Sequence, residues 1–314
     1  MLDGWNMKKK IVVFGSFVVD LMGRGPHLPV PGETVKSPFF KMGAGGKGFN
    51  QGVAAHKAGG DVTMVTKLGK DTFSGIATGA MEELGMDTSH LLWTEEQGTG
   101  VALIEVDETT GQNAIMVIPS ACDHIEEKEV EALSGLLDEA DILLTQLETN
   151  MSSIEKVIGM AYEKGKQIIL NTAPVQPVSD ALLKKVSIVT PNEVEAGILT
   201  GIPVTDQESA SKAAEFFFQK GVQAVVITMG GKGAFISDGK TERMIPAFQV
   251  KAVDTTGAGD AFNGGFAAAL AEGKDLFEAG IFGSAVAALS VQKMGTTPSM
   301  PERAEVDAFL AKNS

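Results

Sequence analysis

A lone aspartate follows a glycine-rich turn at the point where an apolar run begins. In the segment DTTGAGDAFNGG, residues 254–265, Asp260 comes directly after Gly257, Ala258 and Gly259. One chemical use of this arrangement is that backbone N–H groups hold an anion while the carboxylate removes a proton beside it. Aspartate is also favoured in the first turn of any helix by capping and by the helix dipole. From this segment alone, a simple helix start is the favoured interpretation.

The composition excludes several classes of function. The 314 residues are 44% hydrophobic and 21% charged, which is ordinary for a globular protein with a sizeable core. A net charge of −14 argues against a nucleic-acid partner. Cys122 is the only cysteine, so no disulfide framework is expected, and we interpret it as a small, half-buried residue. Neither a signal peptide nor a membrane span is found, which predicts a cytoplasmic protein without membrane contact.

Short β-branched runs alternate with helical patterns along the chain. One intervening helix ends at Gly85, which is typical of a C-cap, and the alanine-rich segment 277–292 is interpreted as a core helix. The alternation predicts an α/β fold with a doubly wound, mostly parallel sheet and helices on both faces. Buried parallel strands are predicted at residues 11–15, 62–69, 141–147, 167–171, 187–192 and 224–230.

Two segments interrupt this alternation. Residues 16–44 hold four prolines and no helical pattern, and residues 98–119 have the pattern of a β-hairpin around DETTG. Both segments could belong to one small sheet that projects from the main domain. No linker or internal repeat divides the chain, so we expect a single domain over residues 8–314. Residues 1–7 are interpreted as an N-terminal extension.

Four of the predicted strands are followed by polar or glycine-rich groups. Asp20 comes after the first strand and Glu148 after the strand at 141–147, while PNEVE and TMGGKG stand at the ends of two later strands. Ligands of open parallel sheets bind outside the carboxyl ends of the strands. One such group would be explained by turn chemistry alone, but four on one edge indicate a ligand site.

Two nucleotide-binding motifs are excluded. GAGGKGFNQ, residues 43–51, contains G-x-G-x-x-G, but a proline-rich excursion separates it from the first strand and Asp61 precedes the next strand instead of ending it. Neither GGKGFN nor GGKGAF supplies the Lys-Ser/Thr pair of a P-loop. The four histidines have no spacing that suits a metal site.

Three ordered motifs resemble the ribokinase (PfkB) family of carbohydrate kinases over nearly the whole chain. They are GGKGFNQ at 45–51, TPNEVEAGILTG at 190–201 and VDTTGAGDAFNGGF at 253–266, and PGETV with TGVALI is similar to the ribokinase branch. The resemblance implies a ribokinase-like fold with a small β-sheet lid, made by the segments 16–44 and 98–119. It further implies that the lid covers the sugar and pairs with its counterpart in a homodimer.

The same resemblance implies a reaction. Asp260 would be the base that takes the proton from the primary hydroxyl of a sugar as that oxygen attacks the γ-phosphate of ATP. Gly257, Ala258 and Gly259 would form the anion hole. D-ribose is the implied substrate and ribose 5-phosphate the product. A kinase for 2-deoxyribose or another furanose, and a sugar-binding regulator without turnover, are kept as alternatives.

The resemblance also assigns binding positions. Val18 departs from the family, which usually has Asn there, and a valine cannot hydrogen-bond a sugar hydroxyl, so 2-deoxyribose stays open. SAC at 120–122 likewise replaces a more usual GAN. The positions implied for the sugar are Val18, Asp20, Gly46, Lys47, Asn50, Glu148 and Asp260.

ATP and its cations are assigned in the same way. Mg²⁺ is expected with the phosphates near Asn192 and Glu195, and K⁺ is expected as an activator beside the anion loop. Ser284 stands where the family would have histidine. The implied ATP positions are Asn192, Glu195, Thr228, Gly230, Gly233, Gly259 and Ser284. The implied K⁺ positions are Asp254, Thr256, Ser290, Lys293, Gly295 and Ser299.

Overall fold

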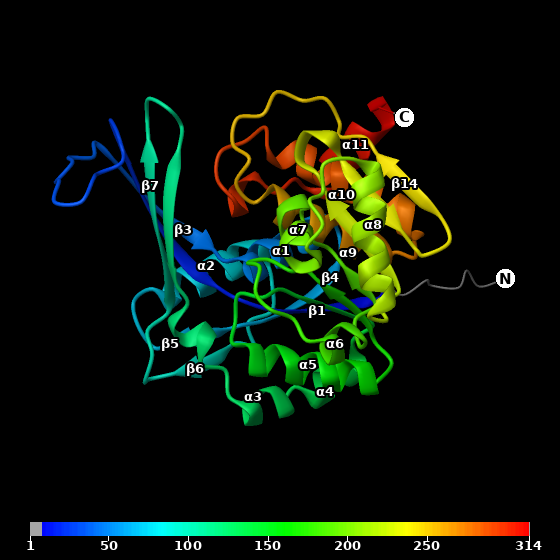
Figure 1. The fold of residues 1–314 in the computed structure, drawn as a ribbon. Coiled ribbons are helices and arrows are strands. Elements are labelled where there is room, and N and C mark those ends of the chain that lie inside the picture. The colour runs from blue at the N-terminus through cyan, green and yellow to red at the C-terminus, as the bar shows by residue number, and fades with distance from the viewer. Residues whose placement is uncertain (1–7, 314) are drawn as a thin grey trace.

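An eight-stranded sheet forms the centre of the computed structural model, which describes residues 8–313 (Figure 1). The strand order is β14-β13-β12-β11-β10-β9-β1-β4, parallel from β4 to β12 and antiparallel at β13 and β14. This mostly parallel sheet confirms the predicted fold class. The bounds are β1 Lys10–Phe14, β4 Asp61–Val65, β9 Ile142–Thr145, β10 Gln167–Leu170, β11 Ile188–Val189, β12 Ala224–Thr228, β13 Ala234–Ser237 and β14 Glu242–Ile245. The predicted N-terminal extension, residues 1–7, lies outside the described residues.

Helices cover both faces of the sheet because successive side chains of each strand point to opposite sides. Ile11 and Val13 of β1 pack into one core, whereas Val12 and Phe14 pack into the other. None of the described helices combines the length and apolarity needed to cross a membrane. The first core is covered by α1 Lys47–Lys57, α2 Ser74–Leu84, α9 Ala258–Ala271, α10 Leu276–Ser290 and α11 Arg303–Asn313. The second is covered by α3 Glu127–Glu131, α4 Ser134–Glu139, α5 Met151–Glu163, α6 Asp180–Leu183, α7 Glu193–Thr200 and α8 Gln207–Gln219.

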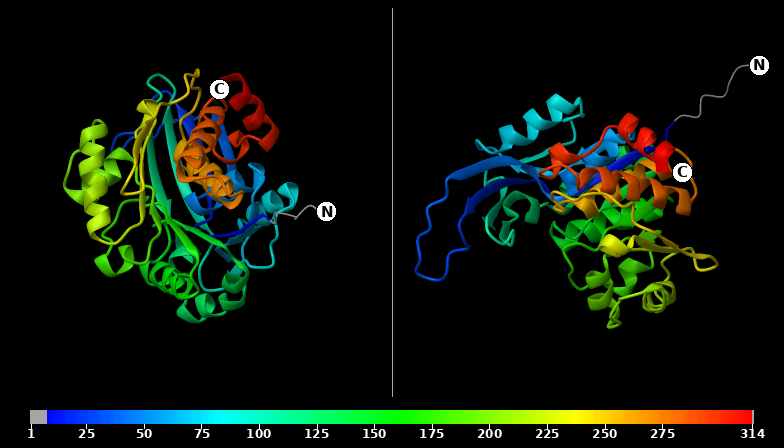
Figure 2. Two further views of the ribbon diagram at one scale, coloured as in Figure 1. Left: turned by 90° about the vertical axis from the view of Figure 1, so that its right-hand side faces the viewer. Right: turned by 90° about the horizontal axis from the view of Figure 1, so that it is seen from above.

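A four-stranded sheet stands beside the main body, at the left of Figure 1. Its order is β3-β2-β7-β8, and it is built from the two segments that interrupt the alternation, as expected. Figure 2 shows the connection between β2 and β3 projecting beyond the rest of the chain. The bounds are β2 Val18–Gly25, β3 Phe39–Gly45, β7 Gly100–Asp107 and β8 Asn113–Ile118.

Several sequence predictions need correction. The strand predicted at 62–69 breaks at Thr66, and residues Lys67–Gly69 form β5, which pairs with β6, Leu92–Thr94, in a separate sheet. The strand predicted at 187–192 covers only β11, because Asn192 already caps α7. The antiparallel strands β13 and β14 were not predicted, since their short runs follow a glycine-rich turn that was interpreted as a ligand loop. Cys122 is fully buried, not half-buried, and its Sγ accepts from Phe17 N at 3.3 Å.

The Gly85 and hairpin predictions are confirmed. Gly85 ends α2 with φ 67°, in the left-handed conformation of a C-cap. The hairpin β7–β8 closes over residues 107–112, where Asp107 Oδ1 accepts from the backbone N–H groups of Thr109 and Thr110. The helix predicted at 277–292 is α10.

Ser120 carries backbone strain that a glycine would relieve. Its φ is 48°, the one positive φ of a non-glycine residue in the described part of the chain. We expect Ser120→Gly to raise the free energy of unfolding by about 1 kcal/mol, because left-handed strain exceeds the extra entropy that glycine gains in the unfolded chain. Urea unfolding measures the change. Ser120→Ala keeps the Cβ and serves as control; an equal gain in this variant would contradict strain as the cause.

Candidate functional site

The N-terminus of α1 is bonded to the segments that follow β1 and β9. Lys47 N donates to Glu148 Oε2 at 2.8 Å, and Gly48 N donates to Ser16 Oγ at 3.3 Å. A Cβ on Gly48 would lie 2.6 Å from the backbone of Gly15, so the helix can approach this closely only with glycine. These N–H groups already have protein partners. The occupancy agrees with the exclusion of GAGGKGFNQ as a phosphate-binding motif.

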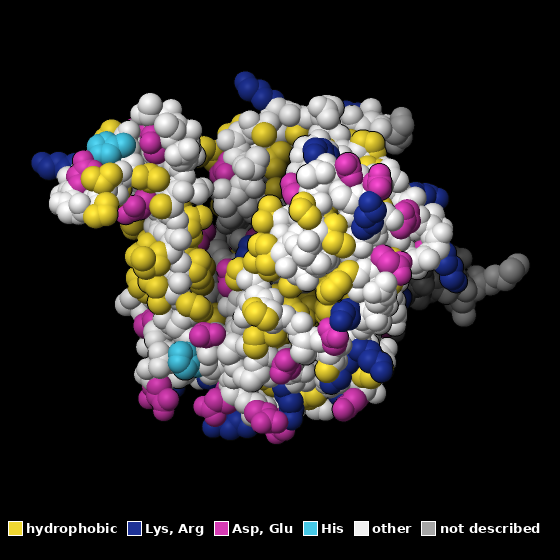
Figure 3. Space-filling view, in the orientation of Figure 1, with side chains coloured by type: hydrophobic (Ala, Val, Ile, Leu, Met, Phe, Trp, Pro, Cys, Tyr) yellow, Lys and Arg dark blue, Asp and Glu magenta, His cyan; other side chains and the backbone are white. Residues whose placement is uncertain are grey.

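All seven residues predicted to bind a sugar line one cavity of about 540 Å³. The predicted residues are Val18, Asp20, Gly46, Lys47, Asn50, Glu148 and Asp260. The cavity lies between the four-stranded sheet and the strand ends, in the hollow visible in Figure 3. Further lining residues that the sequence did not assign to the site include Ala102, Ile115, Asp123, Thr149 and Gln176.

Asp260 is buried at the wall of this cavity with 7% of its surface exposed. Asn50 Nδ2 donates to its Oδ2 at 3.1 Å, and Gln51 Nε2 donates to its Oδ1 at 3.0 Å. Burial raises the pKa of Asp260, while the Lys47 ammonium and the two amide donors lower that pKa. A carboxylate that borders a cavity and is held only by donors can accept a proton from a bound hydroxyl.

The first turn of α9 is left open to an anion. Gly257 is the N-cap with φ 75°, and no side chain caps this helix, whereas Asn192 and Asp275 cap α7 and α10. At Gly259 nothing lies within 4 Å of the place where a Cβ would stand. Ala258 N already donates to Thr255 O at 3.2 Å, so the neighbouring N–H groups of this accessible helix N-terminus would form the anion site.

A second cavity of about 580 Å³ lies on the other side of this turn. Thr255, Ala258 and Gly259 line it, whereas Thr256, Gly257 and Asp260 line the first cavity. The segment 255–260 therefore separates the two. The ATP positions found here are Asn192, Thr228, Gly230, Gly233, Gly259 and Ser284.

The second cavity has a largely apolar wall that the sequence did not reveal. Phe248 and Val250, from the connection after β14, line it together with Phe262 and Val291. Such a wall suits a flat heteroaromatic ring, with the polar groups near the glycine-rich turn fixing its orientation. No motif marks residues 247–250, so only the fold places them here.

Glu195 does not line either cavity. Its Oε1 accepts from Asn192 Nδ2 at 2.8 Å and its Oε2 accepts from Asn192 N at 3.0 Å, which makes it part of the cap of α7. In the described part of the chain no three His, Cys, Asp or Glu side chains gather as a metal cage. Mg²⁺ that arrives with phosphates keeps several waters, and Glu195, whose two oxygens already accept from Asn192, would meet such an ion through water.

Asp254 joins the two loops predicted to hold K⁺. Its Oδ1 accepts from Thr256 N at 3.0 Å and its Oδ2 accepts from Gly295 N at 2.9 Å. A carboxylate and nearby backbone carbonyls are hard oxygen donors, which suits an alkali cation. Three of the predicted positions are thus brought together.

The other predicted K⁺ positions use their side chains elsewhere. The hydroxyl of Ser290 donates to Ala287 O, and that of Ser299 donates to Thr296 O. Lys293 Nζ forms an ion pair with a glutamate of α11 at 2.9 Å. These residues could reach a cation only through their backbone carbonyls.

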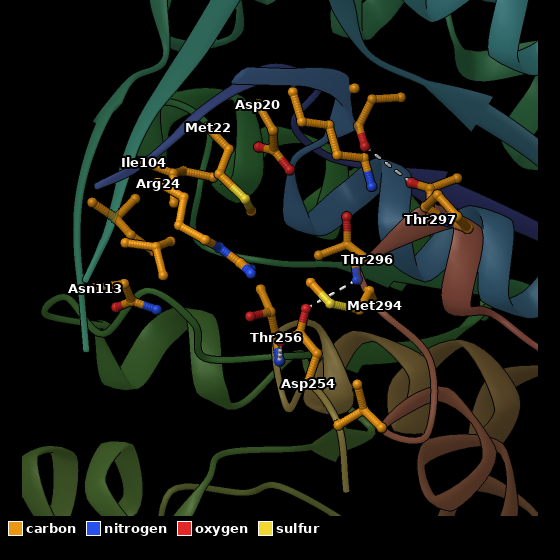
Figure 4. Close-up of a pocket in the computed structure, with 18 of the residues that line it drawn as sticks. Asp20, Met22, Arg24, Ile104, Asn113, Asp254, Thr256, Met294, Thr296 and Thr297 are labelled. Carbon is orange, nitrogen blue, oxygen red and sulfur yellow. Dashed lines mark hydrogen bonds between the residues drawn. The ribbon is translucent and has the colours of Figure 1, made fainter. Parts of the chain in front are cut away.

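Three side chains of strand β2 line an adjoining third cavity of about 640 Å³, which shares Asp20 and Thr256 with the sugar cavity. Figure 4 shows Asp20, Met22 and Arg24 projecting toward Asp254 and Thr256. Burial, together with the negative charges of Glu148 and Asp260, raises the pKa of Asp20 to about 6. Burial acts to raise the pKa of Asp254, but hydrogen bonds from the backbone N–H groups of Gly295 and Thr256, with a smaller contribution from the charge of Arg24, lower it overall.

Comparison with known proteins gives consistent matches. A family model described as pfkB family carbohydrate kinase matches residues 8–303. A ribokinase from Haemophilus influenzae is 41% identical, covering 97% of this chain and 99% of the relative. A deoxyribokinase from Salmonella typhi is 34% identical over 96% of this chain and 99% of the relative. The structure of a ribokinase from Arabidopsis thaliana complexed with ribose and ATP is 31% identical, with a TM-score of 0.89 over 97% of this chain and 99% of that one.

The raised pKa of Asp20 predicts a stabilising substitution. The pKa of Asp20 in the folded protein, about 6, exceeds the ordinary value of 3.8, so ionisation of Asp20 lowers the free energy of unfolding. This decrease develops as the pH rises from about 4 to about 6. We expect Asp20→Asn to raise the free energy of unfolding by about 2 kcal/mol at pH 8, which discounts the full two-unit shift for partial exposure. The gain should vanish near pH 4. Denaturant unfolding across this range tests it, and a gain independent of pH would contradict the charge as cause.

Proposed function

This chain belongs to the pfkB family of carbohydrate kinases, and we propose that it transfers the γ-phosphoryl group of ATP to the 5-hydroxyl of D-ribose. It is thus an ATP-dependent phosphotransferase with an alcohol group as acceptor. The observation that carries the proposal is the segment 255–260, which separates two cavities and presents Asp260 to one and Gly259 to the other. A ribokinase complexed with ribose and ATP shares the fold over nearly the whole chain.

Each part of the segment has a role in the transfer. Asp260 takes the proton of the primary hydroxyl as the oxygen attacks the γ-phosphorus, and ADP leaves toward the second cavity. The N–H groups at the start of α9, around Gly257 to Gly259, stabilise the charge that develops on the phosphoryl oxygens. Asp20, Asn50 and Glu148 bind sugar hydroxyls and hold the reacting oxygen near the base.

Two cations complete the proposal. Mg²⁺ on the phosphates, near Asn192 and Glu195, would neutralise charge during the transfer. K⁺ would be held by Asp254 and by backbone carbonyls of the loop that includes Gly295, and its charge would strengthen anion binding at the start of α9. A cytoplasmic location and a single domain over residues 8–314 stay predictions.

A second candidate substrate is 2-deoxyribose. Val18 packs with Ala102 and Ile104 into an apolar patch on the sheet above the sugar cavity. A sugar carbon without a hydroxyl would leave no unpaired polar group against this patch, whereas a hydroxyl there would find no partner on these side chains. A deoxyribokinase is among the relatives of this chain.

A panel of acceptors tests the proposed function. ADP release is measured with Mg-ATP, K⁺ and ribose, 2-deoxyribose, fructose or adenosine. The highest kcat/KM with ribose supports the proposal, and the highest with 2-deoxyribose supports the second candidate. Sugar binding without any ADP release would indicate a regulator and contradict both.

We further propose that the four-stranded sheet acts as a lid and pairs with a second copy of the chain. Alternate residues of its strands face away from the cavity, and Leu21 stands in register between Met42 and Leu103. On this outer face large apolar side chains are exposed, including Phe40 at 68% and Met116 at 63%. Such a continuous apolar face suits a symmetric interface, which buries the same patch on both copies.

The base is tested by Asp260→Asn. The amide keeps the shape but cannot take a proton at neutral pH, so kcat should fall by at least about 10²-fold while the sugar dissociation constant stays within a few-fold. Initial rates and titration calorimetry measure the two quantities. Asp61→Asn, on the exposed start of β4, is the matched control and should keep wild-type kcat. Retained turnover in Asp260→Asn would contradict its role.

The lid interface is tested by Met116→Glu. A carboxylate buried against a second copy would cost several kcal/mol, so this variant should be monomeric where the wild-type chain is dimeric. Sedimentation velocity measures the change. Ile198→Glu, on an equally exposed residue of α7 at 61%, should leave the dimer intact. A wild-type monomer, or a dimer unaffected by Met116→Glu, would contradict the interface.

A further inference from the structure

The carboxylate of Asp260 accepts a hydrogen bond from a glutamine that lines neither the sugar cavity nor the second cavity. Gln51, in α1, is fully buried and is absent from the residues that line either cavity. Its Nε2 donates both to Asp260 Oδ1 and to Asn171 Oδ1, each at 3.0 Å. Its Oε1 accepts from Gln146 Nε2 at 2.7 Å. Asn171 and Gln146 are also buried, with 6% and 1% exposed.

The backbone carbonyl of Thr190 fixes the donor and acceptor roles along this series of side-chain hydrogen bonds. The carbonyl of Thr190 can only accept, so Asn171 turns its Nδ2 toward it, at 2.7 Å. Asn171 Oδ1 can then only accept from Gln51, so Gln51 must turn its Nε2 toward Asn171. The same Nε2 donates to Asp260. A flipped Gln51 would set its oxygen against the oxygens of Asn171 and Asp260 and lose these bonds.

The main chain leaves room for this arrangement. A Cβ on Gly15 would lie 2.1 Å from Gln146 Oε1, so the turn after β1 admits the Gln146 amide only because residue 15 is glycine. Gln146 follows β9, Asn171 follows β10 and Thr190 follows β11, which are neighbours in the sheet. The amides of Gln146 and Asn171, with the backbone carbonyl of Thr190, therefore link three adjacent strand ends to Gln51 of α1.

We propose that Gln51, oriented by Asn171 and Gln146, is a positioning residue that holds Oδ1 of Asp260 and directs the carboxylate toward the sugar hydroxyl. The proposal rests on the proposed kinase function. Asn50 differs from Gln51, because it binds the other oxygen and also lines the sugar cavity. Gln51 can act on the reaction only through Asp260.

Neutral donors suit a base better than a direct ion pair. Amides hold a buried carboxylate ionised, whereas a bonded ammonium would lower its proton affinity much further. The charged groups that act on Asp260 from the surrounding elements are Lys47 of α1, Glu148 after β9, Asp20 of β2 and Glu195 of α7. The Gln51 amide adds a hydrogen bond of fixed direction to Asp260 without adding a further charge near it.

Gln51→Met tests the proposal, since methionine has similar length and no amide. We expect kcat to fall about 10- to 100-fold, a part of the full contribution of general base catalysis, while KM for the sugar stays within about threefold. The acidic limb of the kcat–pH profile should move up by about one pH unit, because the ionised form of Asp260 loses a donor. Gln219→Met, at an exposed position of α8, should leave both unchanged.

Gln51→Glu keeps the shape and covers the case in which the methionine variant does not fold. Two carboxyl groups in contact must share a proton, so the acidic limb should again move to higher pH. A folded variant with unchanged kcat and an unmoved limb would overturn the positioning role. A wild-type chain that phosphorylates no sugar would instead overturn the proposed function, so the two failures are distinguishable.

Discussion

The proposed phosphoryl transfer depends on one buried carboxylate, Asp260, which stands at the junction of two cavities. Burial alone would favour the neutral form of Asp260, which could not take a proton from a substrate. Two amide donors oppose this effect of burial, and so does the Lys47 ammonium, which forms no ion pair with Asp260 among the described contacts. Residues far apart in the sequence must therefore converge on this carboxylate, and the packing of the helices brings them together.

Close contact between α1 and α9 delivers those donors. A Cβ on Gly264 would lie 2.4 Å from Gln51 O, and one on Gly265 would lie 2.6 Å from the side chain of Val286. The paired glycines of α9 therefore let it approach α1 on one side and α10 on the other. This approach sets the Asn50 and Gln51 amides against Asp260. The glycines near the site thus serve helix packing as well as the proposed anion site.

The site could be predicted from sequence only where chemistry and local pattern coincide. Asp260 stands in a distinctive motif, and Asp20 and Glu148 stand at strand ends, so their convergence on one cavity follows from the predicted sheet. Gln51 stands in the GGKGFNQ motif, but neither it nor Asn171 was assigned a role, because local sequence does not show which groups a buried amide contacts. The strand break at Thr66 and the apolar wall at 247–250 escaped prediction for a related reason, since each is set by which sheet or cavity the chain meets, not by local composition.

The charges around the two cavities explain why a kinase on this scaffold would need metal cations. No lysine or arginine is found among the described residues that line the second cavity. In the sugar cavity, Lys47 is the one such residue among the described lining residues. Four carboxylates, those of Asp20, Asp123, Glu148 and Asp260, line the same cavity as Lys47. A polyphosphate beside this excess of carboxylates would be repelled unless backbone N–H groups and bound cations offset its charge. The open start of α9 supplies the N–H groups, and the proposed Mg²⁺ and K⁺ positions flank it. Bound Mg²⁺ and K⁺ would thus supply the positive charge that lysine and arginine side chains do not provide in these two cavities.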